Sequence, residues 1–248
     1  MKYTSEEIAV MARGGKILAD VKKTLAGMVK IGVSAQELEE KAVAMIAEAG
    51  AEPSFMKVPK YHWATCINVN AGIVHGIPTE ELVFREGDLV SIDLGVYYQG
   101  FHTDSSLSVA INPTPEMAKF LEVGQLAMKK ALAQAVAGNR VWDISQTIGE
   151  TVKMAGYSPV RALVGHGVGR ELHEEPMIPC LAIGDRDKSL LLENGMSLAI
   201  EVMYTAGKPD LVQAFDGWTI TTRDGKISGL FEETVVVGGG KPRVLTTY

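Results

Sequence analysis

The chain has 248 residues, of which 46% are hydrophobic and 22% are charged. Its 24 basic and 30 acidic residues give a formal net charge of −6, which disfavours non-specific binding to nucleic acid. Two cysteines are too few for a disulfide framework, and neither an apolar signal segment nor an apolar run of about 18 residues is present. We therefore expect a cytoplasmic protein with no membrane contact and no direct nucleic-acid readout.

Four helices are predicted from capping signals. Ser or Thr followed three positions later by Glu predicts capping boxes, and hence helices, over residues 4–29 and 34–50. A Thr-Pro pair predicts a third helix over residues 114–138. Asp143 is expected to cap a fourth helix, over residues 143–156, which ends at a glycine.

Runs rich in β-branched residues predict strands between and after these helices. They cover residues 65–69, 89–98, 106–111, 197–203, 218–222 and 230–237. No linker rich in Ser, Pro or Gly interrupts the chain, so residues 1–248 are expected to form one α/β (α+β) domain.

The two halves of the chain share a short pattern. In Gly87–Asp93, and again in Gly195–Glu201, an apolar strand ends in a carboxylate six residues after a glycine. A later strand in each half carries a further carboxylate, Asp104 in the first and Glu232 in the second. The pattern favours two related halves that each bring a carboxylate pair to a shared centre, although repeats of this length also arise by chance.

Several carboxylates lie inside apolar strand segments. Asp93 and Glu201 are flanked by apolar residues, where an unpaired ionised carboxylate costs several kcal/mol. Taken singly, Asp93 and Asp104 are also compatible with turn or edge positions. Glu232 and Glu233 are neighbours on one strand, so the two-residue period should turn one inward and the other outward. Together, these residues favour a cation site over a structural explanation.

The segment Gly165–Pro176 carries two histidines, His166 and His173, among three glycines. Glycines permit close backbone approach, which suits a loop wrapped against a metal or substrate. Imidazole nitrogen in an oxygen-rich site favours a transition metal over Ca²⁺ or Mg²⁺. The glycine pattern also resembles a dinucleotide-binding fingerprint, but no ribose-binding acid follows at the expected point in a βαβ unit, so we do not expect a dinucleotide site. A further histidine, His75, would by itself be compatible with a turn position.

Two aspartates, one histidine and two glutamates suit a pair of divalent metal ions. Bridging carboxylates can hold two cations roughly 3.5–4 Å apart, and a water between them becomes a usable hydroxide near neutral pH. The remaining histidines would be available to hydrogen-bond a substrate. This set of residues favours metal-assisted hydrolysis of a peptide bond.

Several motifs, in order along the chain, resemble those of the methionine aminopeptidases of the short bacterial type (type I), members of the M24 metallopeptidase family. They are His75–Pro78, Ile92–Gly95, Asp104, Gly165–Gly169, His173–Pro176, Ile200–Glu201 and Glu232–Thr234. The resemblance covers essentially the whole chain. It implies a pita-bread fold, in which two pseudo-symmetric halves form a curved antiparallel sheet covered by helices.

The resemblance also implies residue roles. Its metal ligands would be Asp93, Asp104, His166, Glu201 and Glu232, holding two divalent ions of Co, Mn, Fe or Zn. Asp104 and Glu232 would bridge the two ions. Glu201 would also move a proton, and His173 would stabilise the oxyanion. His75 would contact the scissile amide nitrogen.

Four residues fall where the family lines its pocket for a methionine side chain: Tyr61, Cys66, Leu172 and Trp218. A thioether beside aromatic faces is a favourable contact, although each residue is also compatible with plain core packing. Three positions depart from the family pattern. Leu172 replaces an aromatic residue, Val202 replaces proline and Glu233 replaces histidine or asparagine. None is a ligand, but Leu172 could reshape the pocket.

The implied activity is removal of the initiator methionine from peptides and nascent chains at the ribosome, with a small second residue favoured, by a monomer. One alternative is an X-Pro aminopeptidase or dipeptidase of the same fold, which usually carries an extra N-terminal domain. The others are a non-catalytic binding module, which would typically have lost ligands, and a structural metal protein without turnover.

Overall fold

The computed structural model describes residues 1–247, which contain four α-helices and two β-sheets. The helices are α1 (Ser5–Met28), α2 (Ala35–Glu48), α3 (Pro115–Ala133) and α4 (Val141–Met154). The strands are β1 (Glu52–Pro53), β2 (Thr65–Val69), β3 (Gly72–Val74), β4 (Leu89–Tyr98), β5 (Phe101–Ala110), β6 (Ser158–Pro159), β7 (Val164–Gly167), β8 (Glu174–Pro179), β9 (Ser197–Thr205), β10 (Leu211–Gln213), β11 (Ile220–Thr222), β12 (Ser228–Val236) and β13 (Arg243–Val244).

The first three helices begin where the capping signals predict. At α1 the Thr4 hydroxyl accepts from Glu7 N, and at α2 the Ser34 hydroxyl accepts from Glu37 N. The glutamate of each pair accepts in return from the backbone N–H of its cap residue, so both capping boxes are confirmed. The third helix begins at Pro115, as the Thr-Pro pair predicts.

Two helix boundaries differ from the prediction. The end of α3 comes before Gly138, because the side-chain amide of Asn139 donates to the Gln134 carbonyl oxygen at 3.0 Å and the chain turns away. Asp143 does not cap α4 from outside. It lies in the first turn, and its carboxylate accepts from Arg140 N at 2.8 Å.

The strand boundaries are set partly by turns. β2 and β4 span the predicted residues, but β5 begins at Phe101 because Gln99 and Gly100, both with positive φ, join it directly to β4. The predicted strand over residues 218–222 begins only at Ile220, because Asp216 Oδ1 accepts from Trp218 N at 2.8 Å in a turn. Short strands such as β7 and β8 were not predicted, because their glycines and prolines have low strand propensity.

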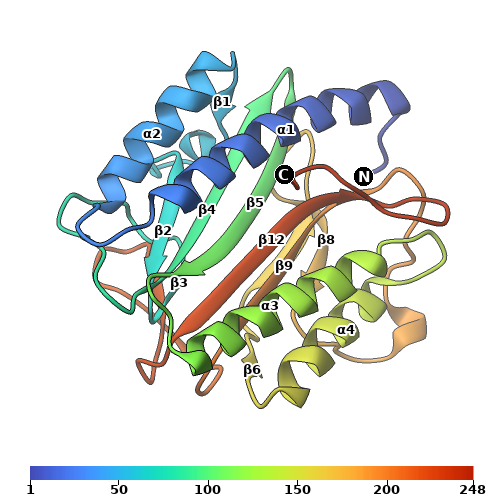
Figure 1. Ribbon diagram of the computed structural model, residues 1–248. Coiled ribbons are helices and arrows are strands. Elements are labelled where there is room, and N and C mark those ends of the chain that lie inside the picture. The colour runs from blue at the N-terminus through green and yellow to red at the C-terminus, as the bar shows by residue number, and fades with distance from the viewer. Residues whose placement is uncertain (248) are drawn as a thin grey trace.

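The larger sheet has ten antiparallel strands with the central order β1-β4-β5-β12-β9-β7-β8. β2 pairs with β4, β6 with β9 and β13 with β12, while β10, β11 and β3 form a second sheet. Helix α1 packs over β4 and β5, and α3 packs over β12 and β9. Figure 1 shows the four helices on one side of this curved sheet. The other face of the central strands is therefore available for a site.

Two similar halves meet where β5 lies beside β12. Asp93 pairs with Ser106 in the first half, and Glu201 pairs with Glu232 in the second. Ser106 and Glu232 also pair with each other across the seam. An approximate two-fold axis through this last pair relates Asp93 to Glu201, as the repeat predicts. The counterpart of Glu232, however, is Ser106 and not Asp104.

Hydroxyl groups bridge the seam on both sides of this axis. Thr234 Oγ1 accepts from Asp104 N at 2.9 Å and donates to Asp104 O at 2.8 Å. At the symmetric position, Ser108 Oγ accepts from Leu230 N at 2.9 Å and donates to Leu230 O at 2.9 Å. These side chains take the place of ladder hydrogen bonds between the strands. The backbone of Asp104 is therefore held by a side chain of the other half.

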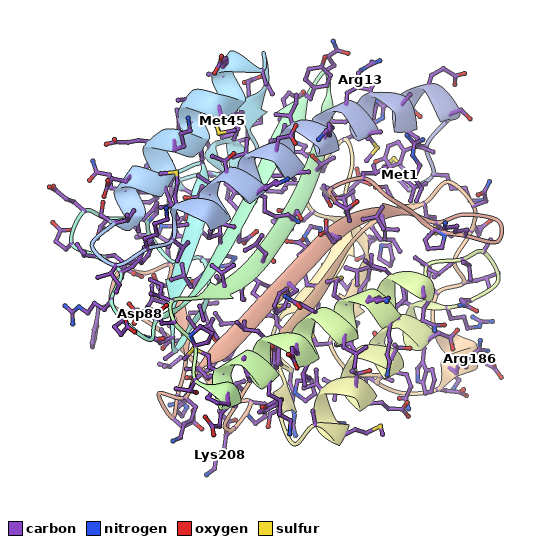
Figure 2. The ribbon with its side chains drawn as sticks, in the orientation of Figure 1. Met1, Arg13, Met45, Asp88, Arg186 and Lys208 are labelled. Carbon is purple, nitrogen blue, oxygen red and sulfur yellow. The ribbon has the colours of Figure 1, made fainter. Side chains whose placement is uncertain are left out.

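The core lies between the helices and the sheet. Ile92 and Leu94 are fully buried on the helix side of β4, while Asp93 between them faces the opposite side. Figure 2 shows side chains along α1 and α3, which lie in front of the sheet. Among residues 1–247, no helix is long and apolar enough to cross a membrane.

Candidate metal centre

The predicted acidic ligands lie on four adjacent strands, β4, β5, β12 and β9. Cross-strand pairing places Asp93, Ser106, Glu232 and Glu201 in one row. Directly paired residues face the same side of a sheet, so the three carboxylates in this row share a face. Asp104 lies two residues before Ser106 and therefore faces the same side. This face is the one opposite α1 and α3.

His166 joins the row from β7. It pairs with Ala199, two residues before Glu201, and its Nε2 lies 3.6 Å from Glu201 Oε1 and 4.0 Å from Asp104 Oδ2. Its Nδ1 lies 2.9 Å from the carbonyl oxygen of Gly167, which fixes the proton on Nδ1 and leaves the Nε2 lone pair facing the carboxylates. The histidine was expected in a loop but lies on a strand.

The glycines around His166 permit close approach between strands rather than to a ligand. A Cβ at Gly165 would lie 2.6 Å from Ala199 O, and one at Gly167 would lie 2.4 Å from Glu175 O. Any other residue would push β7 away from β9 or β8. The expectation that these glycines wrap a loop against a metal or substrate is therefore wrong, because Gly165 and Gly167 make room for neighbouring strands.

Three carboxylates of this face each have one buried oxygen without a hydrogen-bond donor. Asp93 Oδ1, Asp104 Oδ1 and Glu232 Oε1 are buried with no hydrogen-bond partner in residues 1–247. Ligand atoms of Asp104, His166 and Glu232 all lie within 4.8 Å of one another. Buried carboxylates without donors need a cation, and this combination of oxygen and imidazole nitrogen suits a divalent transition metal. The residues therefore fit a metal site.

Burial shapes the acid–base properties of the centre. Desolvation raises the pKa of Asp93 to about 7 and lowers the pKa of His166 to about 4. Desolvation, followed by the charges of neighbouring carboxylates, raises the pKa values of Asp104, Glu201 and Glu232 well above their usual range. His166 is therefore a neutral imidazole near pH 7, and its contacts with the carboxylates are not ion pairs.

Two further histidines flank the centre. The His173 ring lies 4.4 Å from the His166 ring in an edge-to-face arrangement, and His75 lines the same cavity. Desolvation lowers the pKa of both flanking histidines. His75 has a positive φ of 59°, and the adjacent Gly76 N donates to Asn68 Oδ1 at 2.9 Å, which holds this strained turn in place.

A cavity of about 170 Å³ opens onto the carboxylate row. All the residues predicted for the site line it: Tyr61, Cys66, His75, Asp93, Asp104, His166, Leu172, His173, Glu201, Trp218 and Glu232. Phe55, Val58 and Val74 also line the cavity and were not predicted. Phe55 lies in a short 3-10 helix that no periodic pattern marks.

Part of the cavity is lined by apolar residues, which begin beside Asp93 at its cross-strand partner Cys66. Phe55, Tyr61, Cys66 and Leu172 form a hydrophobic cluster separate from the main core. The ring of Tyr61 lies 5.0 Å from that of Trp218 at an interplanar angle of 74°. Tyr61 also donates to the Thr65 carbonyl oxygen at 2.8 Å, so its polar group is satisfied. The cavity thus joins an apolar pocket to a set of carboxylates without donors.

Comparisons with known proteins identify the family of this chain. The model of metallopeptidase family M24 matches residues 9–238. A protein of Aquifex aeolicus named methionine aminopeptidase is 38% identical over 251 residues, which cover 98% of this chain and 97% of that protein. The crystal structure of methionine aminopeptidase from Thermotoga maritima matches with a TM-score of 0.97 at 34% identity, over 100% of this chain and 99% of that one.

A prolidase from Pyrococcus furiosus shares the fold more distantly. Its TM-score is 0.77 at 23% identity, and this chain covers only 65% of its length. The likeness to these structures confirms the expected pita-bread fold, with its two pseudo-symmetric halves and curved antiparallel sheet. The chain belongs to metallopeptidase family M24.

Proposed function

We propose that this protein is a methionine aminopeptidase, a metal-dependent hydrolase that removes N-terminal methionine from peptides and nascent chains. Its relatives of that name match nearly the whole chain at 33–38% identity. The observation that carries the proposal is one cavity whose lining joins apolar side chains to buried carboxylate oxygens without hydrogen-bond partners.

Two divalent metal ions would be held by Asp93, Asp104, His166, Glu201 and Glu232. The support is the common face of these residues and the unpartnered oxygens of three of them. When bound, the ions would supply Lewis acidity toward the scissile carbonyl and acidify a water molecule. We propose that these ions are Co, Mn, Fe or Zn.

The chain's own residues would carry the proton and charge movements. Glu201 would accept a proton from the attacking water and deliver it to the leaving amine. His173, neutral because burial lowers its pKa, would donate an N–H hydrogen bond to the developing oxyanion. His75 would hold the scissile amide nitrogen from the strained turn beside Gly76.

The apolar part of the cavity would take the methionine side chain. Tyr61 and Trp218 line this pocket, and thioether–aromatic contacts are each worth about 0.3–1.5 kcal/mol. Cys66 and Leu172 would complete its walls. We extend the proposal to a small second residue in the substrate and to a monomer that acts on nascent chains at the ribosome in the cytoplasm.

The X-Pro alternative has less support. Its structural representatives share the fold at 20–24% identity, and this chain spans 62–65% of their length. The methionine aminopeptidase of Thermotoga maritima is covered almost completely.

The test is release of free methionine from Met-Ala-Ser and from Met-Pro peptides, with Ala-Pro as the control substrate. The protein would be stripped with EDTA and reloaded separately with Co(II), Mn(II), Fe(II) or Zn(II). We expect metal-dependent release of methionine that Asp104→Ala abolishes. Cleavage of Ala-Pro alone would support the X-Pro alternative, and no cleavage with any metal would contradict both.

A further inference from the structure

Leu172 and His173 reach the cavity from a segment without regular structure. Residues 168–173 connect β7 to β8 and belong to no helix or strand. His102 N on β5 donates to Gly169 O at 2.6 Å and holds the start of the segment. A donor to an oxyanion must be placed accurately, so the end of the segment also needs support from elsewhere in the fold.

The N-terminal residues supply this support. Lys2 forms an isolated bridge with Met196, and Tyr3 N donates to Gly195 O at 2.9 Å, so the segment before α1 lies against the start of β9. Met1 is labelled in Figure 2 beside the start of α1. The Tyr3 side chain points inward, is 6% exposed and packs edge-on against Phe101 at 5.8 Å.

The Tyr3 hydroxyl is the centre of a small network. It donates to both carboxylate oxygens of Glu174, at 2.7 and 2.8 Å, and accepts from Arg170 N at 3.1 Å. Glu174 Oε1 also accepts from Glu171 N at 3.1 Å. Residues on both sides of His173 are thus tied to one hydroxyl group.

Two observations indicate that this contact is built into the fold. A Cβ at Gly169 would lie 2.0 Å from the Tyr3 hydroxyl oxygen, so the last glycine of the Gly165–Gly169 motif makes room for it. Burial, and then the hydrogen bond to Glu174, raise the pKa of Tyr3 far above the working range, so its hydroxyl stays a donor.

We propose that Tyr3 is a positioning residue whose hydroxyl, through Glu174, holds His173 and Leu172 at the cavity. The proposal rests on the proposed function for its effect on turnover. Removing one hydrogen-bond donor to an oxyanion lowers kcat by about 10²–10³-fold. Because loss of the Tyr3 hydroxyl would loosen His173 rather than remove it, we expect a smaller fall in kcat, roughly tenfold.

The kinetic test is a double-mutant cycle. Tyr3→Phe keeps the ring against Phe101 and removes only the hydroxyl. We expect kcat for Met-Ala-Ser to fall roughly tenfold with KM changed less than about threefold, and we expect less than a twofold effect in a His173→Ala background. Equal losses in the two backgrounds, or no loss in the first, would overturn the proposal.

A matched control lies on the same segment. Glu7 forms an ion pair with Arg170 on the outer face of the segment. Glu7→Gln removes this ion pair, while the amide oxygen of the glutamine can still accept from Thr4 N in the capping box beside Tyr3. We expect its kcat to stay within about twofold of the wild type. A loss as large as that of Tyr3→Phe would overturn the specific role of the hydroxyl. The Mn(II) Kd from calorimetry should be the same in the wild type and Tyr3→Phe. A tenfold loss of affinity would show a general disturbance instead.

A measurement independent of turnover completes the test. Amide hydrogen exchange of residues 169–174 in the metal-free protein should be faster in Tyr3→Phe than in the wild type, and unchanged exchange would contradict the proposal. If the wild type released no methionine with any metal, the proposed function would fail. The exchange rates would still decide whether Tyr3 holds the segment.

Discussion

Glu232 and Glu233 are neighbours on β12, yet they lie in opposite environments. Glu232 faces the cavity, is 3% exposed and has an oxygen without a hydrogen-bond partner. Glu233 faces α1, where Lys22 Nζ lies 2.9 Å from its Oε1 and hydroxyl groups of Ser105 and Thr246 donate to its Oε2. The two side chains lie on opposite faces of the sheet, as predicted, but Glu233 faces the helix layer rather than outward.

The difference between these two environments distinguishes a candidate metal ligand from a carboxylate with a structural role. On the helix side, the protein itself supplies the cation and the donors that a buried carboxylate needs. On the cavity side, Glu232 Oε1 is buried without a hydrogen-bond partner, and burial with the charge of Asp104 raises the pKa of Glu232. The departure from the family pattern at Glu233 also has a physical reason here, because the buried Lys22 pairs with a carboxylate.

Substituting each glutamate tests this comparison most directly. Glu232→Gln removes a candidate metal ligand, and we expect kcat/KM to fall by roughly 10²-fold or more together with Mn(II) affinity. Glu233→Gln should keep kcat/KM within about threefold, because its side chain lies on the other face. Steady-state kinetics at saturating metal would measure both. Similar losses in the two variants would contradict the division between faces.

Removing the cation on the helix side should cost stability. Lys22→Met leaves Glu233 buried without its ion-pair partner, and we expect the free energy of unfolding to fall by about 3–5 kcal/mol in urea titrations. The double variant Lys22→Met/Glu233→Gln should recover most of this loss. Lys16→Met, which breaks an exposed pair with Asp20, is the matched control and should cost less than about 1 kcal/mol. Equal losses at the two lysines would show that the buried pair is not special.

The cavity face should make the metal-free protein sensitive to pH. Because the folded pKa of Asp93 is raised from 3.8 to about 7, the folded state binds the proton more tightly than the unfolded state. Its contribution to stability is present below pH 3.8 and is lost as the pH rises toward 7. Thermal unfolding in EDTA should therefore show a slope over this window that Asp93→Asn reduces. An unchanged slope would contradict the raised pKa.

Metal binding should reverse this loss, since a ligand at 100 times its Kd adds about 2.7 kcal/mol of stability. The gain should be larger at pH 7 than at pH 5, because the carboxylates must lose protons to bind a cation. Thermal unfolding with and without excess Mn(II) at the two pH values measures it.

The smallest expected effect concerns the apolar part of the cavity. Leu172→Phe would add an aromatic face beside the proposed methionine pocket, and we expect KM for Met-initiated peptides to fall roughly 2- to 10-fold. Peptides that begin with alanine serve as the control. An unchanged KM would count against contact between Leu172 and the substrate side chain.

Much of this protein was predictable from local sequence. The capping boxes at Thr4 and Ser34 and the bounds of β2 and β4 follow from signals within a few residues. The side-chain period of a strand separated Glu232 from Glu233 in the same way. Most residues of the cavity could be named because they fall at positions that match a known family, but Phe55, Val58 and Val74 could not. Local pattern alone left Asp93 and Asp104 compatible with structural roles.

Only the tertiary structure decided how these parts meet. The row from Asp93 to Glu201 depends on β5 pairing with β12, more than 120 residues away along the chain, and no local signal sets that register. The same holds for Tyr3, whose hydroxyl contacts Glu174 across a sequence separation of 171 residues. Caps and periodicity are fixed by hydrogen bonds and side-chain directions within one element. Pairing between distant segments depends instead on packing free energy summed over the whole fold.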